Sequence, residues 1–383
     1  MRTHKIEHAP MVRLGELIEP LDRRNNDRKF DISYVRGISN SKEIMQTKAD
    51  VDENVISKFY IINPGEFIYN PRTTRMGEKV GLGFNNTNTP LLFSFNNLAF
   101  RIKESANNSV LPEYLYINFT RNNFDRFARI NSWGSATEIF SYDDLFSFQI
   151  PLPSIETQKE LVAVYNGLKE LAEENEKLLE PLEESCQAFI VDCKKKYPSK
   201  ELGNYIEECD ERNESGKYTL DDVRGISNLK ELIETKADMN GVSLTSYKLL
   251  KPKEFSYVSV TSRNGDKISI AINNTEQTFI VSSSYINFKV YKNDELLPEF
   301  LFTLLNRDSF NLYSRFNSWG SARETFDWSE MCRVQIPVPP LEIQQKIVDL
   351  YNCYEECKRI STVAREKIKN LCPALVQKAA HSE

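Results

Sequence analysis

Two kinds of hydrophobic pattern alternate along this chain of 383 residues. In the first kind, short runs rich in Phe, Ile and Tyr are separated by clusters of Asn, Pro and Gly, which is typical of strands joined by turns. These runs predict strands at residues 58–62, 66–69, 91–95 and 98–102. Residues 112–129, and the matching residues 298–315, carry apolar side chains at helical spacing, and each predicts one helix. The globular parts of the chain are therefore expected to combine strands with short helices.

The second kind of pattern predicts a long helix that begins near residue 156. Its apolar positions lie alternately four and three residues apart, a spacing that buries one stripe of a helix against another helix. Ser154 can cap its N-terminus, and Pro181 is expected to interrupt and kink it. At ~1.5 Å per residue, a helix over 156–196 would span roughly 60 Å. The stripe consists of Leu161, Tyr165, Leu168, Ala172, Asn175, Leu179, Leu182, Cys186, Phe189 and Cys193.

A second stripe of this kind follows residue 340 and predicts a second long helix. Because each helix offers a single apolar stripe, each is the obvious partner of the other. Two polar side chains, Asn175 and Ser361, interrupt the stripes. They either fix the register of the helices or mark a partly solvated seam. The second stripe consists of Ile343, Ile347, Leu350, Tyr354, Cys357, Ser361, Ala364, Ile368, Leu371 and Leu375.

The chain repeats itself once over nearly its whole length. Residues 35–50 and 223–238 are identical at 12 of 16 positions, at an offset of 188. Residues 131–136 and 317–322 are identical throughout, at an offset of 186, because two residues are missing between Phe288 and Leu297. A long unit that occurs only twice indicates pseudo-twofold symmetry rather than a solenoid.

Composition fits a cytoplasmic protein with two or three domains. The seven cysteines include no CxxC pair, which disfavours a disulfide framework or a zinc ribbon. No apolar run of 18 residues is present, so no membrane span is expected, and the N-terminus does not look like a signal peptide. The net charge is −6, with residues 1–150 summing to +1 and residues 201–340 to −5. Any basic face on this chain is therefore expected to be small.

No motif for catalysis is found. The three histidines are His4, His8 and His381, close to the two ends of the chain, which argues against histidine-centred acid–base chemistry. No nucleotide-binding loop, zinc-protease motif or nucleophile elbow occurs. We therefore expect a non-catalytic chain that needs no cofactor or metal of its own.

Several short motifs occur twice and in the same order. A Gln-Ile-Pro segment leads into each long helix, and a Gln lies within the first turns that follow. Leu14-Gly15 and Leu202-Gly203 look like the opening strand of each copy, and an Arg/Gly-containing segment lies near the middle of each. The segments are residues 149–153 with 158–162, residues 335–342 with 345–348, and residues 69–79 and 257–267.

Together these motifs resemble the specificity subunit of type I restriction-modification systems, and the resemblance covers essentially the whole chain. It implies an α+β fold in which two similar, strand-rich target recognition domains are separated by two long antiparallel coiled-coil helices. It also implies binding of two modification (methyltransferase) subunits and, through them, of a restriction subunit where one exists. S-adenosylmethionine, ATP and Mg²⁺ would belong to those partners. The expected domains are residues 1–153, 154–197, 198–339 and 340–383.

Three pairs of polar and basic segments are candidates for contact with double-stranded DNA, because Arg, Asn, Ser and Lys are the side chains that read bases and hold phosphates. Each has a purely structural alternative: a solvated hairpin tip for the segment around residue 75, a turn anchored by a buried Trp133 or Trp319, and an internal ion pair for Arg36 and Arg224. The candidate residues are Arg36, Ser39, Asn70, Arg72, Thr73, Arg75, Lys79, Ser135, Thr137, Arg224, Ser227, Thr261, Arg263, Asn264, Lys267, Ser321 and Arg323.

The leading hypothesis is a DNA sequence-specificity subunit that reads a bipartite site with related, inverted half-sites. The alternative is a coiled-coil protein–protein scaffold without sequence-specific DNA binding. The two copies differ at candidate positions, for example Arg72 against Val260 and Thr137 against Arg323. The half-sites are therefore expected to be similar but not necessarily identical.

Overall fold

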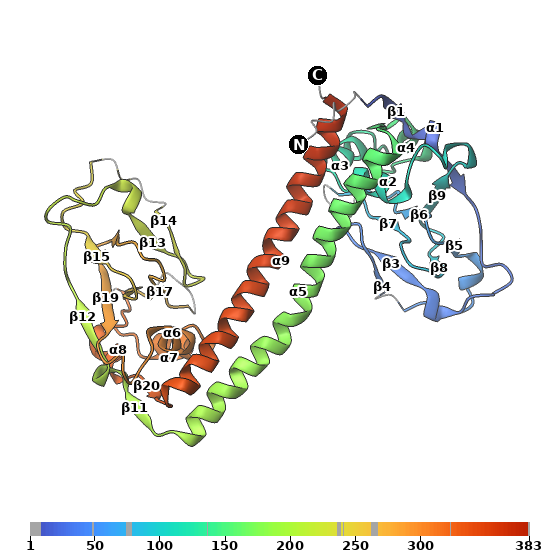
Figure 1. Ribbon diagram of the computed structural model, residues 1–383. Helices are drawn as coiled ribbons and strands as arrows, with labels where there is room; N and C mark the ends of the chain where they lie inside the picture. Colours follow the sequence, from blue (N-terminus) through green and yellow to red (C-terminus); the bar gives the residue numbers. More distant parts are fainter. Residues whose placement is uncertain are drawn as a thin grey trace. The chain divides into compact units, whose positions relative to one another are not determined.

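The structure is a computed structural model that describes residues 9–47, 50–73, 79–135, 137–235, 239, 241–261, 267–321 and 323–381, with side chains up to residue 369. The chain forms two compact units. The first contains residues 1–175 and 359–383, and the second contains residues 176–358. Each unit holds one globular domain and part of each of two long helices, α5 (Ile155–Lys196) and α9 (Leu341–His381) (Figure 1). The expected mixed fold class is confirmed.

The globular domain of the first unit is built around a four-stranded antiparallel sheet. Its order is β2 (Ile18–Leu21), β9 (Leu98–Ile102), β6 (Phe67–Tyr69) and β7 (Leu82–Phe84). Three two-stranded ladders surround it: β1 (Met11–Arg13) with β10 (Gln149–Pro151), β3 (Arg36–Ile38) with β4 (Ile44–Gln46), and β5 (Tyr60–Ile62) with β8 (Leu91–Phe93). The helices are α1 (Leu14–Leu17), α2 (Pro112–Phe119), α3 (Asn122–Ile130) and α4 (Tyr142–Ser147).

The domain of the second unit repeats this topology. Its four-stranded sheet has the order β12 (Ile206–Cys209), β19 (Tyr285–Val290), β16 (Phe255–Val258) and β17 (Ile270–Ile272). Its ladders are β11 (Ser199–Glu201) with β20 (Gln335–Pro337), β13 (Arg224–Ile226) with β14 (Leu232–Glu234), and β15 (Lys248–Leu250) with β18 (Phe279–Val281). Its helices are α6 (Pro298–Leu305), α7 (Asp308–Phe316) and α8 (Trp328–Arg333).

Aromatic side chains fill the main core of each domain. In the first domain Phe67 stacks on Phe84 and Phe100, with ring centroids 4.8 and 5.0 Å apart. In the second, Phe255 stacks on Phe288 at 4.7 Å. These rings come from neighbouring strands of the sheet, so their stacking also fixes strand register.

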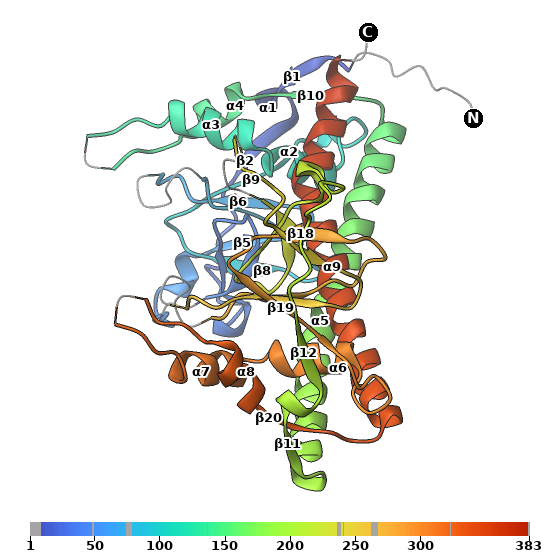
Figure 2. The same cartoon turned by 90° about the vertical axis from the view of Figure 1, so that its left-hand side faces the viewer.

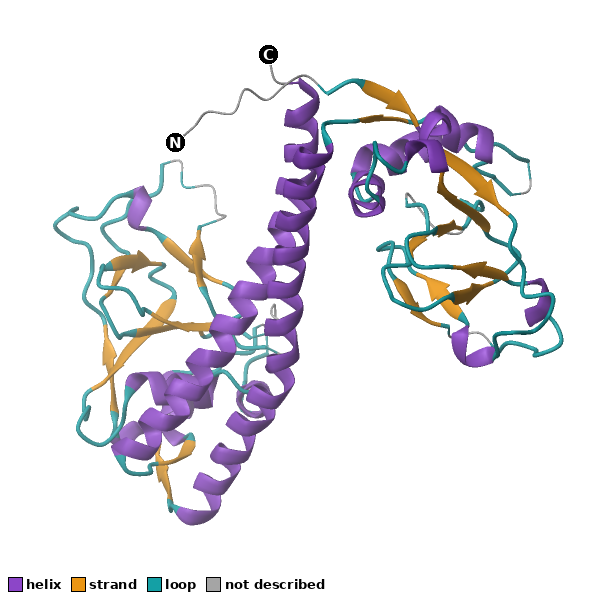
Figure 3. Cartoon of the chain, turned by 45° about the vertical axis from the view of Figure 1, so that its right-hand side comes forward, coloured by secondary structure: helices purple, strands orange, loops and turns teal. Residues whose placement is uncertain are grey.

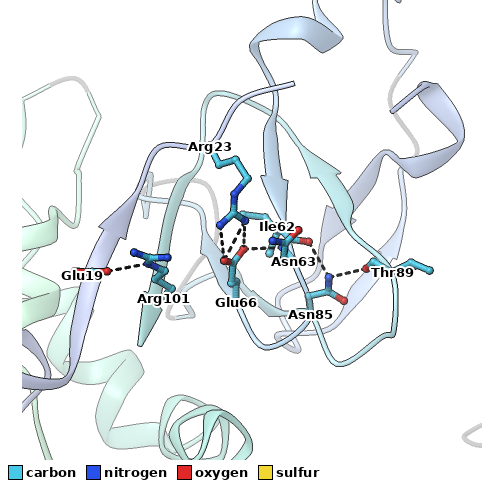
Figure 4. Close-up of polar contacts among 8 residues, drawn as sticks. All are labelled: Glu19, Arg23, Ile62, Asn63, Glu66, Asn85, Thr89 and Arg101. Atoms are coloured by element: carbon cyan, nitrogen blue, oxygen red, sulfur yellow. Dashed lines mark hydrogen bonds and ion pairs between the residues drawn. The ribbon is translucent and has the colours of Figure 1, made fainter. Parts of the chain in front are cut away.

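A partly buried ion pair supports the first sheet at the turn between β5 and β6. Arg23 donates two hydrogen bonds to Glu66 at 2.7 and 3.0 Å through Nη1, and Glu66 also accepts from the backbone N–H of Asn63 at 2.7 Å (Figure 4). Nearby, the Asn85 amide donates to the carbonyls of Ile62 and Thr89, at 2.8 and 2.9 Å. The turn predicted around residue 64 is therefore present, and it is held by the side chain of Glu66 at its end and by that of Asn85, which follows β7.

The two long helices lie side by side within each unit and run in opposite directions (Figures 1 and 3). The Thr157 N–H donates to the Ser154 hydroxyl at 3.3 Å, so the predicted N-cap is confirmed. The predicted interruption at Pro181 is wrong, because α5 continues through it. Proline removes only one backbone donor at this exposed position. The stripe is also wrong at Phe189, which is 53% exposed, because neighbouring Ile190 packs into the core of the second domain instead.

A buried glutamine joins each domain to its long helix. Gln158 accepts from the Leu111 N–H at 2.9 Å and donates to the carbonyls of Ser109 and Pro153, at 2.8 and 2.9 Å. Gln344 makes the equivalent bonds to Leu297, Glu295 and Pro339. The glutamine noted in the sequence of the second copy was Gln345, but that side chain is exposed and donates to Asp349. The buried Gln fixes the direction in which each helix leaves its domain.

Two other sequence predictions are corrected. Residues 112–129 form two helices, because Arg121 is extended and the Thr120 hydroxyl turns back to the carbonyl of Ile117. The break lets Phe119 and Phe124, five residues apart, both reach the core, where their rings lie 4.8 Å apart. Leu14-Gly15 is not an opening strand but the start of α1, and a Cβ on Gly15 would lie 3.0 Å from Phe146 of α4. Residues 298–315 divide in the same way, into α6 and α7.

Candidate nucleic-acid interface

A narrow hairpin follows α3 and brings two of the predicted segments together. Trp133 and Ile139 exchange backbone hydrogen bonds of 3.2 and 2.9 Å and close the hairpin. Its returning strand also pairs with the segment after β6: the Thr73 N–H donates to Glu138 at 3.1 Å, and the Phe140 N–H donates to Pro71 at 2.8 Å. Residues 70–73 and 131–140 thus form one local ladder. Figure 2 shows the hairpins after α3 and α7 projecting from their domains.

The second domain builds the same ladder. The Thr261 N–H donates to Glu324 at 3.0 Å, and the Phe326 N–H donates to Ser259 at 2.8 Å. Trp319 and Thr325 close the hairpin, as Trp133 and Ile139 do in the first domain. The identical Trp-Gly-Ser sequence of the two copies therefore has the same backbone structure, and the residues that follow at the tip differ.

Glycine is required in this hairpin for two reasons. Gly134 and Gly320 have φ of +148° and +143°, a region that side chains rarely adopt. A Cβ at either position would also lie 2.1 Å from a backbone oxygen, that of Thr137 or Arg323. The hairpin cannot close in this form with any other residue there.

The two tryptophans are not buried anchors, as the structural alternative assumed. Trp133 is 69% exposed and Trp319 is 63% exposed. The backbone bonds and Gly134 hold the turn, so the indole is left to face solvent. Other large apolar side chains on the adjoining helices and hairpins are also exposed: Ile130 and Ile139 in the first domain, and Leu312 and Phe316 in the second.

An arginine on the preceding helix stabilises each hairpin. Arg129 of α3 forms an ion pair with Glu138, and Arg315 of α7 forms one with Glu324. Each of these arginines therefore has an internal role in its own hairpin. Both members of the pair recur at the offset of 186 residues, and that recurrence was the signal in the sequence that could have revealed it.

The predicted residues of the ladder fall into three groups. Ser135, Thr137, Ser321 and Arg323 are exposed at the tips of the hairpins, and Lys79 and Lys267 are exposed where the described chain resumes after the first segment. Thr73 and Thr261 are buried, with their hydroxyls directed to the carbonyls of Glu138 and Glu324, so they position the ladder rather than face a ligand. Arg75, Arg263 and Asn264 lie outside the described residues.

Asn70 and Arg72 begin the segment in the first domain. The Asn70 side chain accepts from the Arg72 N–H at 3.0 Å, and Arg72 pairs with Ile139 as an isolated bridge. The corresponding Val260 in the second domain pairs with Thr325. The backbone is shared, but the first domain places a cation at this position and the second an apolar side chain.

The third predicted segment, in the β3–β4 and β13–β14 hairpins, is largely structural. The Arg36 guanidinium donates to the carbonyls of Ser33 and Val35, at 2.6 and 2.8 Å, and Arg224 lies 4.3 Å from the centre of the Phe279 ring. Ser39 and Ser227 accept backbone N–H groups of their own turns, from Glu43 and Glu231. With the residues that the structure describes, neither arginine forms the internal ion pair that was the alternative.

A buried lysine joins this hairpin to α3. The Lys42 ammonium donates to both oxygens of Asp125, at 2.6 and 2.8 Å, and Asp125 accepts from the Val80 N–H at 3.0 Å. Asp125 thus joins the β3–β4 hairpin to Val80, the residue after Lys79. Burial lowers the pKa of Lys42, and the Asp125 carboxylate opposes that effect.

The second domain lacks this carboxylate, because Asn311 stands at the equivalent position. Lys230 donates to the Leu305 carbonyl at 2.6 Å, and burial lowers its pKa to about 8. The Asn311 side-chain oxygen is buried without a hydrogen-bond partner. The buried polar groups around this lysine are therefore less completely hydrogen-bonded in the second domain.

Two other kinds of site are not found in the part of the chain that the structure describes. No cluster of three or more His, Cys, Asp or Glu side chains there could hold a metal ion. No helix in the described ranges has a long enough apolar stretch to cross a membrane.

Comparison with known proteins finds a matching family model and structures of similar fold. The family model "Type I restriction modification DNA specificity domain" matches residues 195–370. The crystal structure of a type I restriction-modification system S subunit from M. genitalium is similar in fold, with a TM-score of 0.64, 10% identity, and coverage of 99% of this chain and 98% of that chain. The HsdS subunit from Thermoanaerobacter tengcongensis, 16% identical, matches with a TM-score of 0.38 over 97% of this chain and 96% of its own. No curated protein matches the sequence.

Proposed function

We propose that this chain, whose residues 195–370 match the type I restriction modification DNA specificity domain, reads a bipartite DNA sequence with one domain for each half-site. The observation that carries the proposal is the ladder formed by residues 70–73 and 131–140 and repeated in the second domain. A rigid hairpin displays exposed polar, basic and aromatic side chains on the same backbone in both copies. Such a support suits base readout, which needs side chains held in fixed positions.

The two half-sites are proposed to be related but not identical. The shared backbone supports similar docking of both domains, and the pseudo-twofold repeat supports inverted half-sites. The side chains at the tips differ: Thr137 in the first domain corresponds to Arg323 in the second, and Arg72 to Val260. Arg323 is exposed and suits guanine, which its guanidinium can bind through two hydrogen bonds.

The chain is further proposed to be non-catalytic and to act through partners. Two modification (methyltransferase) subunits would bind it and carry S-adenosylmethionine, and a restriction subunit would bring ATP and Mg²⁺ where one is present. The low charge of the chain supports this division of labour, because partner subunits would add contacts to the DNA backbone.

The proposal is tested by purifying the chain with its methyltransferase subunit and mapping the methylated adenines in genomic DNA. The expected result is one bipartite motif with two related, inverted half-sites. In the Arg323→Ala variant, discrimination at one position of one half-site should relax, at a cost of about 1–3 kcal/mol. A complex that assembles but shows no sequence-dependent binding or methylation would favour the scaffold alternative.

A further inference from the structure

A groove between the first domain and its long helices is lined by more cations than anions. It consists of two connected parts of ≈ 560 and ≈ 260 Å³, which share Lys42, Tyr116 and Lys169 among their lining residues. Arg36 lies at one end, and Lys79 lies where the predicted DNA-reading segment rejoins the described chain. The long helices contribute Lys169 from α5 and Arg365 and Lys369 from α9. All of these residues belong to the first unit.

The charges of this groove do not cancel. Its cations are Arg36, Lys42, Lys79, Lys169, Arg365 and Lys369, and its anions are Glu43, Asp125 and Glu173, which leaves a formal charge of +3. Lys42 is neutralised by Asp125, and Lys169 lies 3.7 Å from Glu173. Lys79 and Lys369 are exposed, and the Lys169–Glu173 pair is partly exposed and therefore weak, so these three lysines can reach a phosphate.

The corresponding groove of the second unit has the opposite charge. It also has two connected parts, of ≈ 220 and ≈ 400 Å³. Tyr165 of α5 and Tyr116 of α2 line the first groove, and their counterparts in the repeat, Tyr351 and Phe302, line this one. Its cations are Lys230, Arg307 and Lys358, and its anions are Glu183, Glu231, Glu299, Asp308 and Glu355, which gives −2. Glu299 is also paired with Lys253, at 2.7 Å, which reduces the imbalance without reversing it.

Two charge reversals on the long helices account for much of this difference. At the offset of 186 residues, Lys169 corresponds to Glu355 and Lys369 corresponds to Glu183. All four residues line the groove of their own unit. The same fold thus presents a cationic wall in one unit and an anionic wall in the other, so the charge is not a requirement of folding.

We propose that the groove of the first unit holds the phosphate backbone of the bound DNA, so that this unit, and not the second, supplies most of the chain's own salt-dependent affinity. The inference rests on the proposed function. DNA is the occupant because Lys79, which lines the groove, directly follows in sequence the segment proposed to read bases, and because a polyanion matches a lining with three more cations than anions. The net charge of −6 does not reveal the cationic groove of the first unit, because the acidic groove of the second unit offsets its charge.

The test is the salt dependence of DNA binding by the full chain in complex with its methyltransferase subunits. In the Lys169→Gln/Lys369→Gln variant, the slope of log affinity against log salt should be shallower by about 1.8, from two lost phosphate contacts. Between 50 and 200 mM salt, wild type should therefore lose roughly tenfold more affinity than the variant. The matched control is Glu183→Gln/Glu355→Gln, which removes two charges at the equivalent positions and should leave the slope no shallower.

Each outcome decides between specific alternatives. An unchanged slope in the lysine variant overturns the groove as a phosphate site. If the slope is unchanged but less methyltransferase co-purifies, the groove binds an acidic segment of a protein instead. The proposed function fails separately, if wild type does not distinguish its genomic motif from a scrambled duplex. Loss of binding caused by misfolding is recognised by an altered melting temperature, and single Lys→Gln variants then test the same slope.

Discussion

Single residues decide whether the recognition hairpins can form. Gly134 and Gly320 combine a positive φ with a Cβ position only 2.1 Å from a backbone oxygen. Neither feature can be read from one copy of the sequence, but their recurrence within an identical loop pointed to a structural constraint. The exposed Trp133 and Trp319 show the limit of that argument, because large aromatic residues are usually buried and these two are not.

Replacing Gly134 by Ala should open the first hairpin. The strained φ and the clash with the Thr137 oxygen are expected to cost about 1–3 kcal/mol, taken up by loss of the ladder with residues 71–73. Readout of one half-site should weaken while the other is kept, which methylome mapping can measure. Gly167→Ala on α5 is the control, since nothing lies within 4 Å of its Cβ, and it should be neutral or stabilising. A Gly134→Ala protein with both half-sites intact would show that the hairpin does not take part in recognition.

The pKa of Lys230 reports a second single-residue difference between the domains. With its pKa lowered from 10.5 to about 8, the folded protein loses this proton before the unfolded chain does. Stability should therefore rise with pH between about 8 and 10.5, and the full cost of the buried cation is present below pH 8.

Moving one carboxylate by a single helical turn should remove that cost. The Asp308→Asn/Asn311→Asp variant reproduces Asn122 and Asp125 of the first domain without changing the net charge. It should raise the pKa of Lys230, stabilise the protein near neutral pH by about 1–3 kcal/mol, and flatten the rise above pH 8. Urea unfolding at about pH 7.5 and 9.5 measures both effects. Asp308→Asn alone, which removes the carboxylate that raises the pKa of Lys230, should do the opposite; equal stabilisation by both variants would contradict this explanation.

At the scale of elements, periodicity predicted what local sequence determines. The strand at 98–102 was predicted with its observed bounds, and the long helices and the Ser154 cap follow from their patterns. The break at Thr120 could not be predicted, because it depends on where Phe119 and Phe124 meet the core. The ladder between residues 71–73 and 138–140 is likewise non-local, so it could not be read from either segment alone.

Comparison of the repeats also shows that three positions packed together on β4, β6 and β7 differ jointly between the two domains. A Cβ on Gly83 would lie 3.0 Å from Ile44 and 3.2 Å from Ile68, so this strand position must stay bare in the first domain. The second domain has Ala271 there, with Leu232 and Ser256 in place of the two isoleucines. A methyl group is accommodated only where the neighbouring β-branched side chains are absent.

Gly83→Ala should therefore destabilise the first domain by about 1–3 kcal/mol through overpacking. The same substitution should cost less in an Ile68→Ser background, which has the residue of the second domain. A double-mutant cycle by chemical denaturation should give a favourable coupling energy of about 0.5–3 kcal/mol. Ala271→Gly, the reverse change in the second domain, is the control and should not relieve any strain. Strictly additive costs would show that the two positions do not compete for space.

At the scale of the molecule, the repeat made the architecture predictable, whereas the distribution of charge needed the structure. The sequence shows that residues 1–150 sum to +1 and residues 201–340 to −5. Only the structure groups Lys169 and Lys369, which lie far apart in the chain, into one groove. Two domains with one fold are thus proposed to contribute unequally to DNA affinity while both contribute to sequence readout.

Because the two domains share one fold but display different side chains, we predict that they can be exchanged. A chain in which residues 199–337 are replaced by residues 11–151 should fold, because the junction is made by shared chemistry. Gln344 would accept from the N–H of the transplanted Leu111 as it does from that of Leu297, and would donate to the Ser109 carbonyl in place of that of Glu295. The transplanted hairpin would also bring its own support, since Arg129 and Glu138 move together.

The recognised site of this chimera should become a true inverted repeat of the half-site read by the first domain. The spacing between the half-sites should not change, because α5 and α9 are untouched. Its salt dependence should stay close to that of wild type, since Glu183 and Glu355 on the helices still oppose phosphate in the second unit. Methylome mapping and salt titration of the assembled complex measure all three properties. Retention of the original second half-site would place its readout on the long helices, and a changed spacing would show that the domains, rather than the helices, set the distance.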